Sequence, residues 1–125
     1  MSIKSKIKDE FEANNNGLVL SAIVIESHNI DNEDNYAVEI DLYDSNGQVK
    51  GNLDLSYYPN DRVECLDLWL DEDVRGSGTG RAIVRSMEDS TKRLDAKLIN
   101  LKSTNNTFWE HMGYKPKLHN FYKKL

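Results

Sequence analysis

Three glycines stand at alternate positions, Gly76, Gly78 and Gly80, in the stretch GSGTG. Because glycine lacks a Cβ, such spacing leaves backbone amides bare and permits conformations that other residues rarely adopt. The run RVECLDLWL over 62–70 precedes this stretch and is typical of a strand, whereas RAIVRSMEDSTKRL over 81–94 has the apolar spacing of an amphipathic helix. A strand, a glycine turn and a helix in this order present free amides and the positive end of the helix dipole to an anion.

Several nucleotide-binding motifs share this logic and differ in their spacing. A P-loop requires a lysine directly after its last glycine, but Arg81 follows Gly80. The dinucleotide fingerprint G-x-G-x-x-G also fails, because Arg81 or Ile83 stands where its third glycine belongs. The pattern R-x-x-G-x-G does fit, with Arg75, Gly78 and Gly80 in place.

The rest of the chain predicts a sheet flanked by helices. Four strands precede the glycines, at 18–25, 36–43, 49–58 and 62–70. The first is a continuous β-prone run that predicts a buried strand, followed by a polar loop over 26–35. A helix is expected at 3–11, a fifth strand at 96–101 and a short helix over 105–113 that Gly113 ends, while the segment 117–125 is left open between strand, helix and tail.

Composition limits the class of protein. The chain has 125 residues and 38% hydrophobic content, which predicts one domain over 1–125. A net charge of -5 disfavours nucleic acid as a partner, and no apolar run reaches the length of a membrane span or signal core. We therefore expect a cytoplasmic protein. Cys65 has no partner for a disulfide, and the spacing of His28, His111 and His119 predicts no metal site.

Two segments resemble the GNAT superfamily of acyl-CoA-dependent N-acetyltransferases. The segment LDLWLDEDVRGSGTGRAIV, over 66–84, is similar to the family's strand and pyrophosphate loop. The segment FWEHMGYKP, over 108–116, is similar to its later helix. The resemblance implies an α/β (α+β) fold with a mixed, mostly antiparallel twisted sheet and flanking helices, shortened between the first and second strands. It also implies acetyl-CoA (coenzyme A) as cosubstrate, with no metal.

The resemblance assigns the cosubstrate site largely to backbone groups. Amides of the segment 75–81 would hold the pyrophosphate at the helix start, and the strand at 68–70 would pair with the pantetheine arm where the neighbouring strands splay apart. The residues implied are Leu68, Trp69, Leu70, Arg75, Gly76, Ser77, Gly78, Thr79, Gly80, Arg81, Asn105, Phe108 and Trp109.

Catalysis requires a neutral amine, so a general base is expected near the thioester. Glu64 is the proposed general base, acting directly or through a water molecule, because it lies six residues before Leu70, the spacing of the base in some members of the family. Strand alternation puts Glu64 and Leu70 on one face, but a β-bulge would reverse that phase and bring Asp67 to the site instead. The competing interpretation is that both carboxylates are merely solvated. Trp109 stands where the family often has a tyrosine acid, which leaves Tyr114, Tyr122 or solvent as the proton source.

The acceptor is expected to be an amine. Only 26–35 separates the first two strands, where the family usually has two helices that wall the acceptor site. An open site suits a protein lysine or amino terminus, unless a second subunit of a homodimer closes it. Asp31, Glu33 and Asp34 would attract a cationic acceptor. The alternatives are a non-catalytic or weakly catalytic interaction or inhibitor module that keeps the fold, and a small-molecule acetyltransferase acting on polyamines or aminoglycosides.

Overall fold

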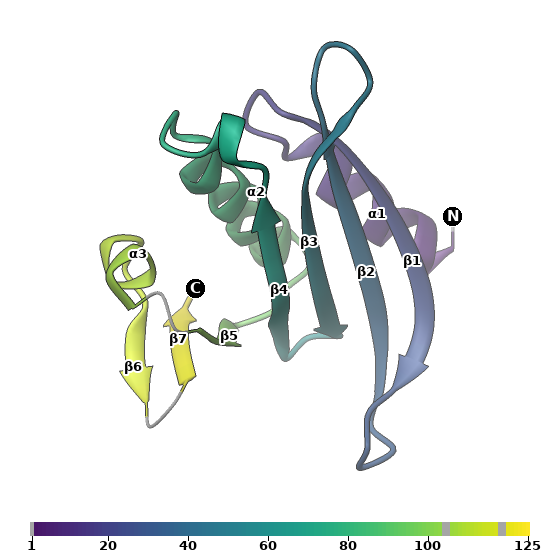
Figure 1. Ribbon diagram of the computed structural model, residues 1–125. Helices are drawn as coiled ribbons and strands as arrows, with labels where there is room; N and C mark the ends of the chain where they lie inside the picture. Colours follow the sequence, from purple (N-terminus) through teal and green to yellow (C-terminus); the bar gives the residue numbers. More distant parts are fainter. Residues whose placement is uncertain (1, 104–105, 118–119) are drawn as a thin grey trace.

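A single sheet of seven strands forms the framework of the protein, in the order β1-β2-β3-β4-β5-β7-β6 (Figure 1). The computed structural model describes residues 2–103, 106–117 and 120–125. The strands are β1 (Val19–His28), β2 (Asp34–Tyr43), β3 (Val49–Tyr58), β4 (Arg62–Leu70), β5 (Leu98–Lys102), β6 (Lys115–Lys117) and β7 (Asn120–Lys124). The helices are α1 (Ile3–Ala13), the short 3-10 helix η1 (Glu72–Val74), α2 (Thr79–Arg93) and α3 (Asn106–His111).

The sheet is mixed and mostly antiparallel, as predicted. Strands β1 to β4 form successive antiparallel pairs, and α2 then provides the crossover that brings β5 parallel to β4. Within the segment 117–125, which the sequence left open, β7 pairs antiparallel with both β5 and β6. The α/β (α+β) fold class is therefore confirmed.

The connection between β1 and β2 is short, which confirms the expected truncation of the fold here. It is shorter than the predicted loop over 26–35, because β1 continues to His28 and β2 begins at Asp34. The Asn29 side chain closes the turn by accepting hydrogen bonds from the backbone N–H groups of Asp31 (3.0 Å) and Glu33 (2.8 Å). Half of the polar segment is thus strand, paired in register across the hairpin.

The prediction that β1 is a buried strand is wrong, because β1 is the edge of the sheet. Ala22 is buried at 1% exposure, while Ile23 and Ile25 are 57% and 52% exposed. Helix α1 covers the free edge at one point, where Glu12 accepts from the Ala22 N–H and Lys8 donates to its carbonyl, each at 2.8 Å. A continuous apolar run thus carries no information about which face a strand buries.

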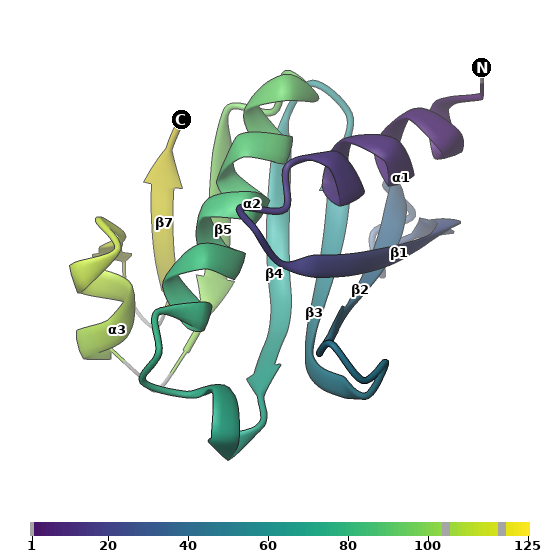
Figure 2. The same ribbon diagram turned by 90° about the horizontal axis from the view of Figure 1, so that it is seen from above.

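Helices α1 and α2 lie on the same face of the sheet (Figures 1 and 2). They contact each other there, and Ser90 of α2 donates to the Glu10 carbonyl of α1. The core lies between these helices and the sheet, and its most buried side chains include Ile7, Phe11, Ile83 and Met87. We call the opposite side of β1 to β5 the uncovered face, since no helix in the described part of the chain packs on it.

Candidate active site

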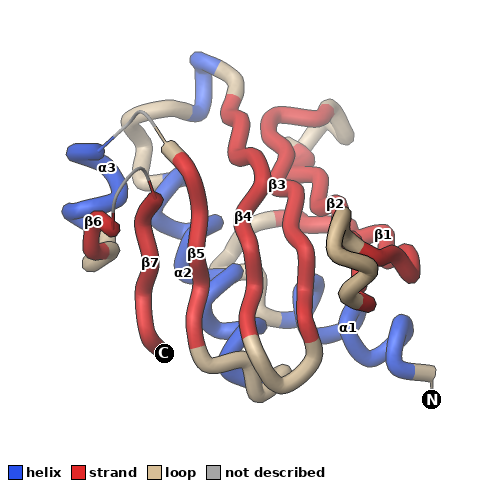
Figure 3. The backbone as a smooth tube through the Cα atoms, turned by 90° about the horizontal axis from the view of Figure 1, so that it is seen from below, coloured by secondary structure: helices blue, strands red, loops and turns tan. Residues whose placement is uncertain are grey.

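Strands β4 and β5 pair over only four residues of β4, from Arg62 to Cys65. The last pair is Cys65 with Leu101, and beyond it β4 continues toward the glycine loop while the two strands separate (Figure 3). A cavity of about 1300 Å³ opens from this point. We call the point where the strands part the apex of the cavity. Strand separation of this kind exposes the backbone edge of β4 to a ligand.

A β-bulge in β4 decides which side chains reach the uncovered face. Asp54 of β3 is opposite Asp67 and Leu55 is opposite Cys65, so Leu66 is an extra residue in β4. Asp67 therefore shares the uncovered face with Glu64, which is opposite Ser56. The alternation that would group residues 64, 66, 68 and 70 does not hold.

The three alternate glycines serve two different purposes. Gly76 and Gly78 have φ angles of +78° and +85°, in the left-handed region that other residues rarely adopt. A Cβ on either would meet no atom within 4 Å, so space stays open above this loop. At Gly80 a Cβ would lie 3.3 Å from Phe108 Cε1 and 3.4 Å from Leu70 Cδ1, so this glycine lets the start of α2 pack against α3 and β4.

Other contacts hold the loop in shape. Gly78 is the N-cap residue of α2, and since it has no side chain it makes no cap hydrogen bond to the amides of the helix's first turn. Arg75 donates from Nε to the Leu70 carbonyl at 2.8 Å and so joins the loop to the end of β4. Ser77 donates to the Val74 carbonyl at 2.8 Å, and its hydroxyl lies 3.0 Å from that of Thr79.

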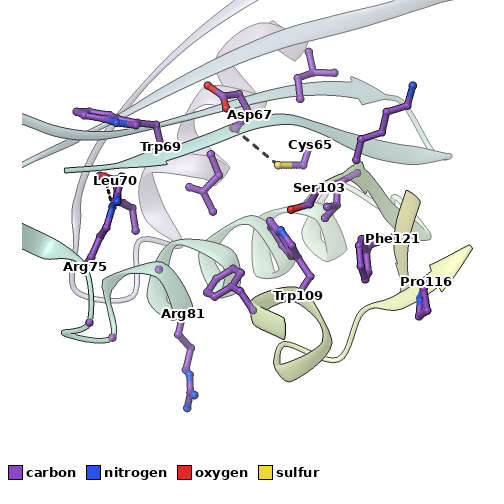
Figure 4. Close-up of a pocket in the computed structure, with 18 residues that line it drawn as sticks. Cys65, Asp67, Trp69, Leu70, Arg75, Arg81, Ser103, Trp109, Pro116 and Phe121 are labelled. Carbon is purple, nitrogen blue, oxygen red and sulfur yellow. Dashed lines mark hydrogen bonds between the residues drawn. The ribbon is translucent and has the colours of Figure 1, made fainter. Parts of the chain in front are cut away.

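Most of the residues predicted to bind a cosubstrate surround the cavity. Figure 4 shows β4, the loop and the aromatic side chains around it. Ser77 and Thr79 are not among the lining residues, and their hydroxyls contact each other within the loop. Asn105 lies outside the described residues. The predicted residues that line the cavity are Leu68, Trp69, Leu70, Arg75, Gly76, Gly78, Gly80, Arg81, Phe108 and Trp109.

The two candidate bases have different surroundings. Glu64 does not line the cavity, and its carboxylate accepts from Arg62 Nε at 3.1 Å. Arg62 also binds Glu33 (3.0 Å) and Asp61 (2.7 Å) and stacks on the Tyr58 ring. Glu64 thus belongs to an ion cluster.

Asp67, in contrast, lines the cavity close to its apex (Figure 4). No ion pair or side-chain hydrogen bond ties its carboxylate to another residue of the described segments. Of the two candidates, only Asp67 offers a free carboxylate to a ligand in the cavity.

Asp67 is one of several carboxylates on the uncovered face. Glu39 is opposite Asp54, which is opposite Asp67, and Asp41 lies nearby on β2. Partial burial, followed by the charges of Glu39 and Asp67, raises the pKa of Asp54. We call these four residues the acidic row. The row gives this side of the cavity a negative potential.

An aromatic cluster forms another wall of the cavity. Trp109 is 5% exposed and packs edge-on against Phe108 and Tyr114, with ring centroids 5.1 Å and 5.0 Å away. The Tyr114 hydroxyl is buried without a hydrogen-bond partner in the described part of the chain, and burial raises its pKa. Neither Tyr114 nor Tyr122 is a lining residue.

Sequence reasoning missed two residues of β4 near the apex and the part of the cavity that lies beyond the edge of β4. Cys65 is buried, and burial raises the pKa of its thiol to about 12. The parallel pairing of β4 with β5 could have indicated that the end of β5 lines the apex. No local sequence pattern indicates that the paired strands β6 and β7 also contribute residues to the cavity. The missed residues are Cys65, Leu66, Leu101, Lys102, Ser103, Pro116 and Phe121.

Within the described ranges, no three His, Cys, Asp or Glu side chains are grouped so that they could hold a metal ion. None of the helices that the structure describes combines the length and apolar character needed to cross a membrane.

Comparison with known proteins gives a consistent result. The model of one protein family, described as an acetyltransferase (GNAT) domain, matches residues 31–116. A solved acetyltransferase from Bacillus cereus is 21% identical, covers 91% of this chain and 79% of its own, and has a TM-score of 0.59. A search of curated proteins found no match.

Two similar structures were solved in complex with coenzyme A. PaiA N-acetyltransferase from Thermoplasma acidophilum is 18% identical, over 70% of this chain and 60% of its own, with a TM-score of 0.60. A GNAT family N-acetyltransferase from Escherichia coli is 17% identical, over 70% of this chain and 58% of its own, also with a TM-score of 0.60. At these identities the likeness concerns the fold.

Proposed function

Because the chain belongs to the GNAT acetyltransferase family, we propose that it binds acetyl-CoA in the cavity between β4 and β5 and transfers the acetyl group to an amine on a protein. The observation that carries this proposal is the continuous path from the glycine loop along the free edge of β4 to Asp67. Acetyl-CoA supplies an activated thioester. The chain supplies the groups that bind it and a carboxylate beside the apex.

The loop residues fit the cosubstrate. The uncapped amides at the start of α2, the open space above Gly76 and Gly78, and the nearby Arg75 and Arg81 suit a pyrophosphate. The free edge of β4 over Leu68–Leu70 suits an extended arm that carries amide groups, because such an arm can pair with a strand edge. Both similar structures with coenzyme A support this assignment.

Asp67 is the residue that we propose as general base. It would accept a proton, directly or through a water molecule, from the amine that attacks the thioester carbonyl. Its carboxylate is free, lines the cavity and lies on the uncovered face, from which an acceptor can approach. Glu64 is the second candidate, and its ion pair with Arg62 counts against it. The proton for the departing thiol would come from Lys102 or from solvent, since neither Tyr114 nor Tyr122 lines the cavity.

A cationic acceptor suits the uncovered face. The acidic row leads from β2 to Asp67, and a protonated lysine or amino terminus would be attracted along it. The hairpin acids contribute less than the sequence suggested, because Arg62 partly neutralises Glu33. A protein acceptor could itself provide the wall that the short β1–β2 connection omits. A cytoplasmic location, a homodimer and the absence of nucleic-acid and membrane partners stay predictions.

Binding of acetyl-CoA in the cavity is tested by calorimetry. Transfer of the acetyl group to a protein amine is tested by intact-mass spectrometry of candidate basic proteins incubated with the enzyme and acetyl-CoA. A gain of one acetyl group, lost in Asp67→Asn, is expected. Absence of acetyl-CoA binding would overturn the proposal.

The second candidate function is a non-catalytic or weakly catalytic interaction module. It is favoured by Trp109 in place of a tyrosine acid and by the absence of Tyr114 and Tyr122 from the cavity lining. Binding of acetyl-CoA without turnover on any amine, even at high pH where amines deprotonate unaided, would support this function instead.

A further inference from the structure

Lys102 is the last residue of β5 and lies at the apex of the cavity. Leu101 is the last residue of β5 that pairs with β4, so Lys102 is the first beyond the point where the strands part. Leu101 is buried and Lys102 is exposed, which places Lys102 on the uncovered face, as Asp67 is. A primary amine of the chain and a free carboxylate thus flank the same point.

The amine of Lys102 is also not engaged elsewhere. Its ammonium group makes no ion pair with any residue in the described ranges, and Asp67 lies beyond the 4.0 Å limit of an ion pair. In contrast, Lys8, Lys50 and Lys123 are each held by a carboxylate. Lys102 can therefore move on its flexible stem without breaking a contact of this kind.

The arrangement of the lining residues along the cavity places Lys102 where the thioester of a bound cosubstrate would lie. The glycine loop with Arg75 and Arg81 occupies one end, and the free edge of β4 leads from it to the apex. An arm anchored by its phosphates at the loop would present its thioester toward the apex. This step rests on the proposed function.

We propose that Lys102 is an acetyl acceptor of the protein itself, modified within one molecule by acetyl-CoA bound in the same cavity. The ammonium loses a proton to Asp67 or to water, and Nζ then attacks the thioester carbonyl carbon. A C–N bond forms, the C–S bond breaks, and the sulfur takes up a proton to leave as free coenzyme A. The products are Nε-acetyl-lysine, coenzyme A and one proton released to solvent. Because the amine and the thioester share one cavity, their effective concentration exceeds that of any lysine attacking from solution.

Lys97 provides a matched control, since it is equally an exposed lysine and lies just before the other end of β5, away from the cavity. The protein is incubated with acetyl-CoA carrying a deuterated acetyl group, and label at each lysine is quantified by peptide mass spectrometry. Lys102 is expected to gain label at least about tenfold faster than Lys97, with a first-order rate that does not depend on protein concentration. Lys102→Arg should remove most of the label, whereas Lys97→Arg should leave it unchanged.

A second measurement does not depend on acetyl transfer. Sulfosuccinimidyl acetate, which acetylates exposed lysines without coenzyme A, should modify both lysines, and added coenzyme A should protect Lys102 alone. Labelling of Lys102 at the rate of Lys97, or a rate that rises with protein concentration, would overturn the inference. If calorimetry shows acetyl-CoA binding in that case, the proposed function stands without it. Absence of binding would overturn both.

Discussion

Asp54 and Asp67 lie directly opposite each other on β3 and β4, at the position where Leu66 forms the bulge. Like charges in facing positions destabilise a sheet, by up to about 1 kcal/mol for each pair. Glu39 faces Asp54 from the other side and adds to this cost. The fold therefore tolerates a repulsive row of carboxylates beside the cavity that we propose as the active site.

Replacement of Asp54 by Asn should stabilise the protein at neutral pH. The pKa of Asp54 is raised above its ordinary value of 3.8, so the folded state binds this proton more tightly than the unfolded state. The stabilisation that protonated Asp54 contributes is fully present below pH 3.8, and it is lost as the pH rises through the pKa of Asp54 in the folded state. Asp54→Asn should gain up to about 1 kcal/mol in urea unfolding at about pH 7 and much less at about pH 4. Asp31→Asn removes the same charge from the exposed hairpin and should show no such gain. Equal effects at the two pH values would contradict the argument.

Asp67→Asn should lower the rate of acetyl transfer by about 10² to 10⁴ at neutral pH, because the attacking amine then loses its general base. The affinity for acetyl-CoA should change little. The rate should recover partly at high pH, where the amine deprotonates without help. Initial rates measured across a pH series check these expectations.

Glu64→Gln is the matched comparison, since Glu64 shares the face but is paired with Arg62. It should have a small effect on the rate. The reverse pattern would transfer the role of base to Glu64, and full activity in both variants would mean that neither carboxylate accepts the proton.

Gly78→Glu should abolish measurable acetyl-CoA binding by calorimetry. A carboxylate at this position would repel a pyrophosphate at the start of α2, and the space beside Gly78 leaves room for it there. The φ of +85° adds backbone strain, so Gly78→Asn serves as the control because asparagine tolerates this region without adding charge. Equal affinity of the Glu variant and the wild type would show that the loop does not bind the phosphates.

Gly51→Ala should destabilise the protein by about 1–3 kcal/mol, as overpacking of a core does. A Cβ on Gly51 would lie 2.8 Å from Leu70 Cδ2 and 3.0 Å from the Trp69 carbonyl oxygen, so the Leu70 side chain must turn away and the β4 backbone must give by a few tenths of an ångström where it lines the cavity. Denaturant unfolding measures the loss. The control Ser56→Ala, on the same strand and outward-facing, should stay within about 0.5 kcal/mol of the wild type. An unchanged midpoint for Gly51→Ala would show that β4 moves at no cost.

Features that depend on neighbouring residues could be predicted from the sequence. Strand alternation identified β2, β3 and β4, and apolar spacing identified α1 and α2, since side-chain direction follows the local backbone period. The glycine turn between β4 and α2 was predicted from three residues, because a positive φ is a property of the residue itself. These local signals, with the family resemblance, were enough to identify the fold class and most of the cavity lining.

Other features depend on pairing between distant segments, and only the tertiary structure decided them. The run 18–25 was predicted to be buried, yet β1 lies at the edge of the sheet and its Ile23 and Ile25 side chains are exposed. The bulge at Leu66 arises from the register of β4 against β3, so alternation within the strand favoured Glu64 and left Asp67 as its competitor. Lys102 joins Asp67 at the apex only because β5 pairs with β4 and then parts from it. A strand's sequence sets which residues alternate, but its neighbours set the register, the exposed face and the point of separation.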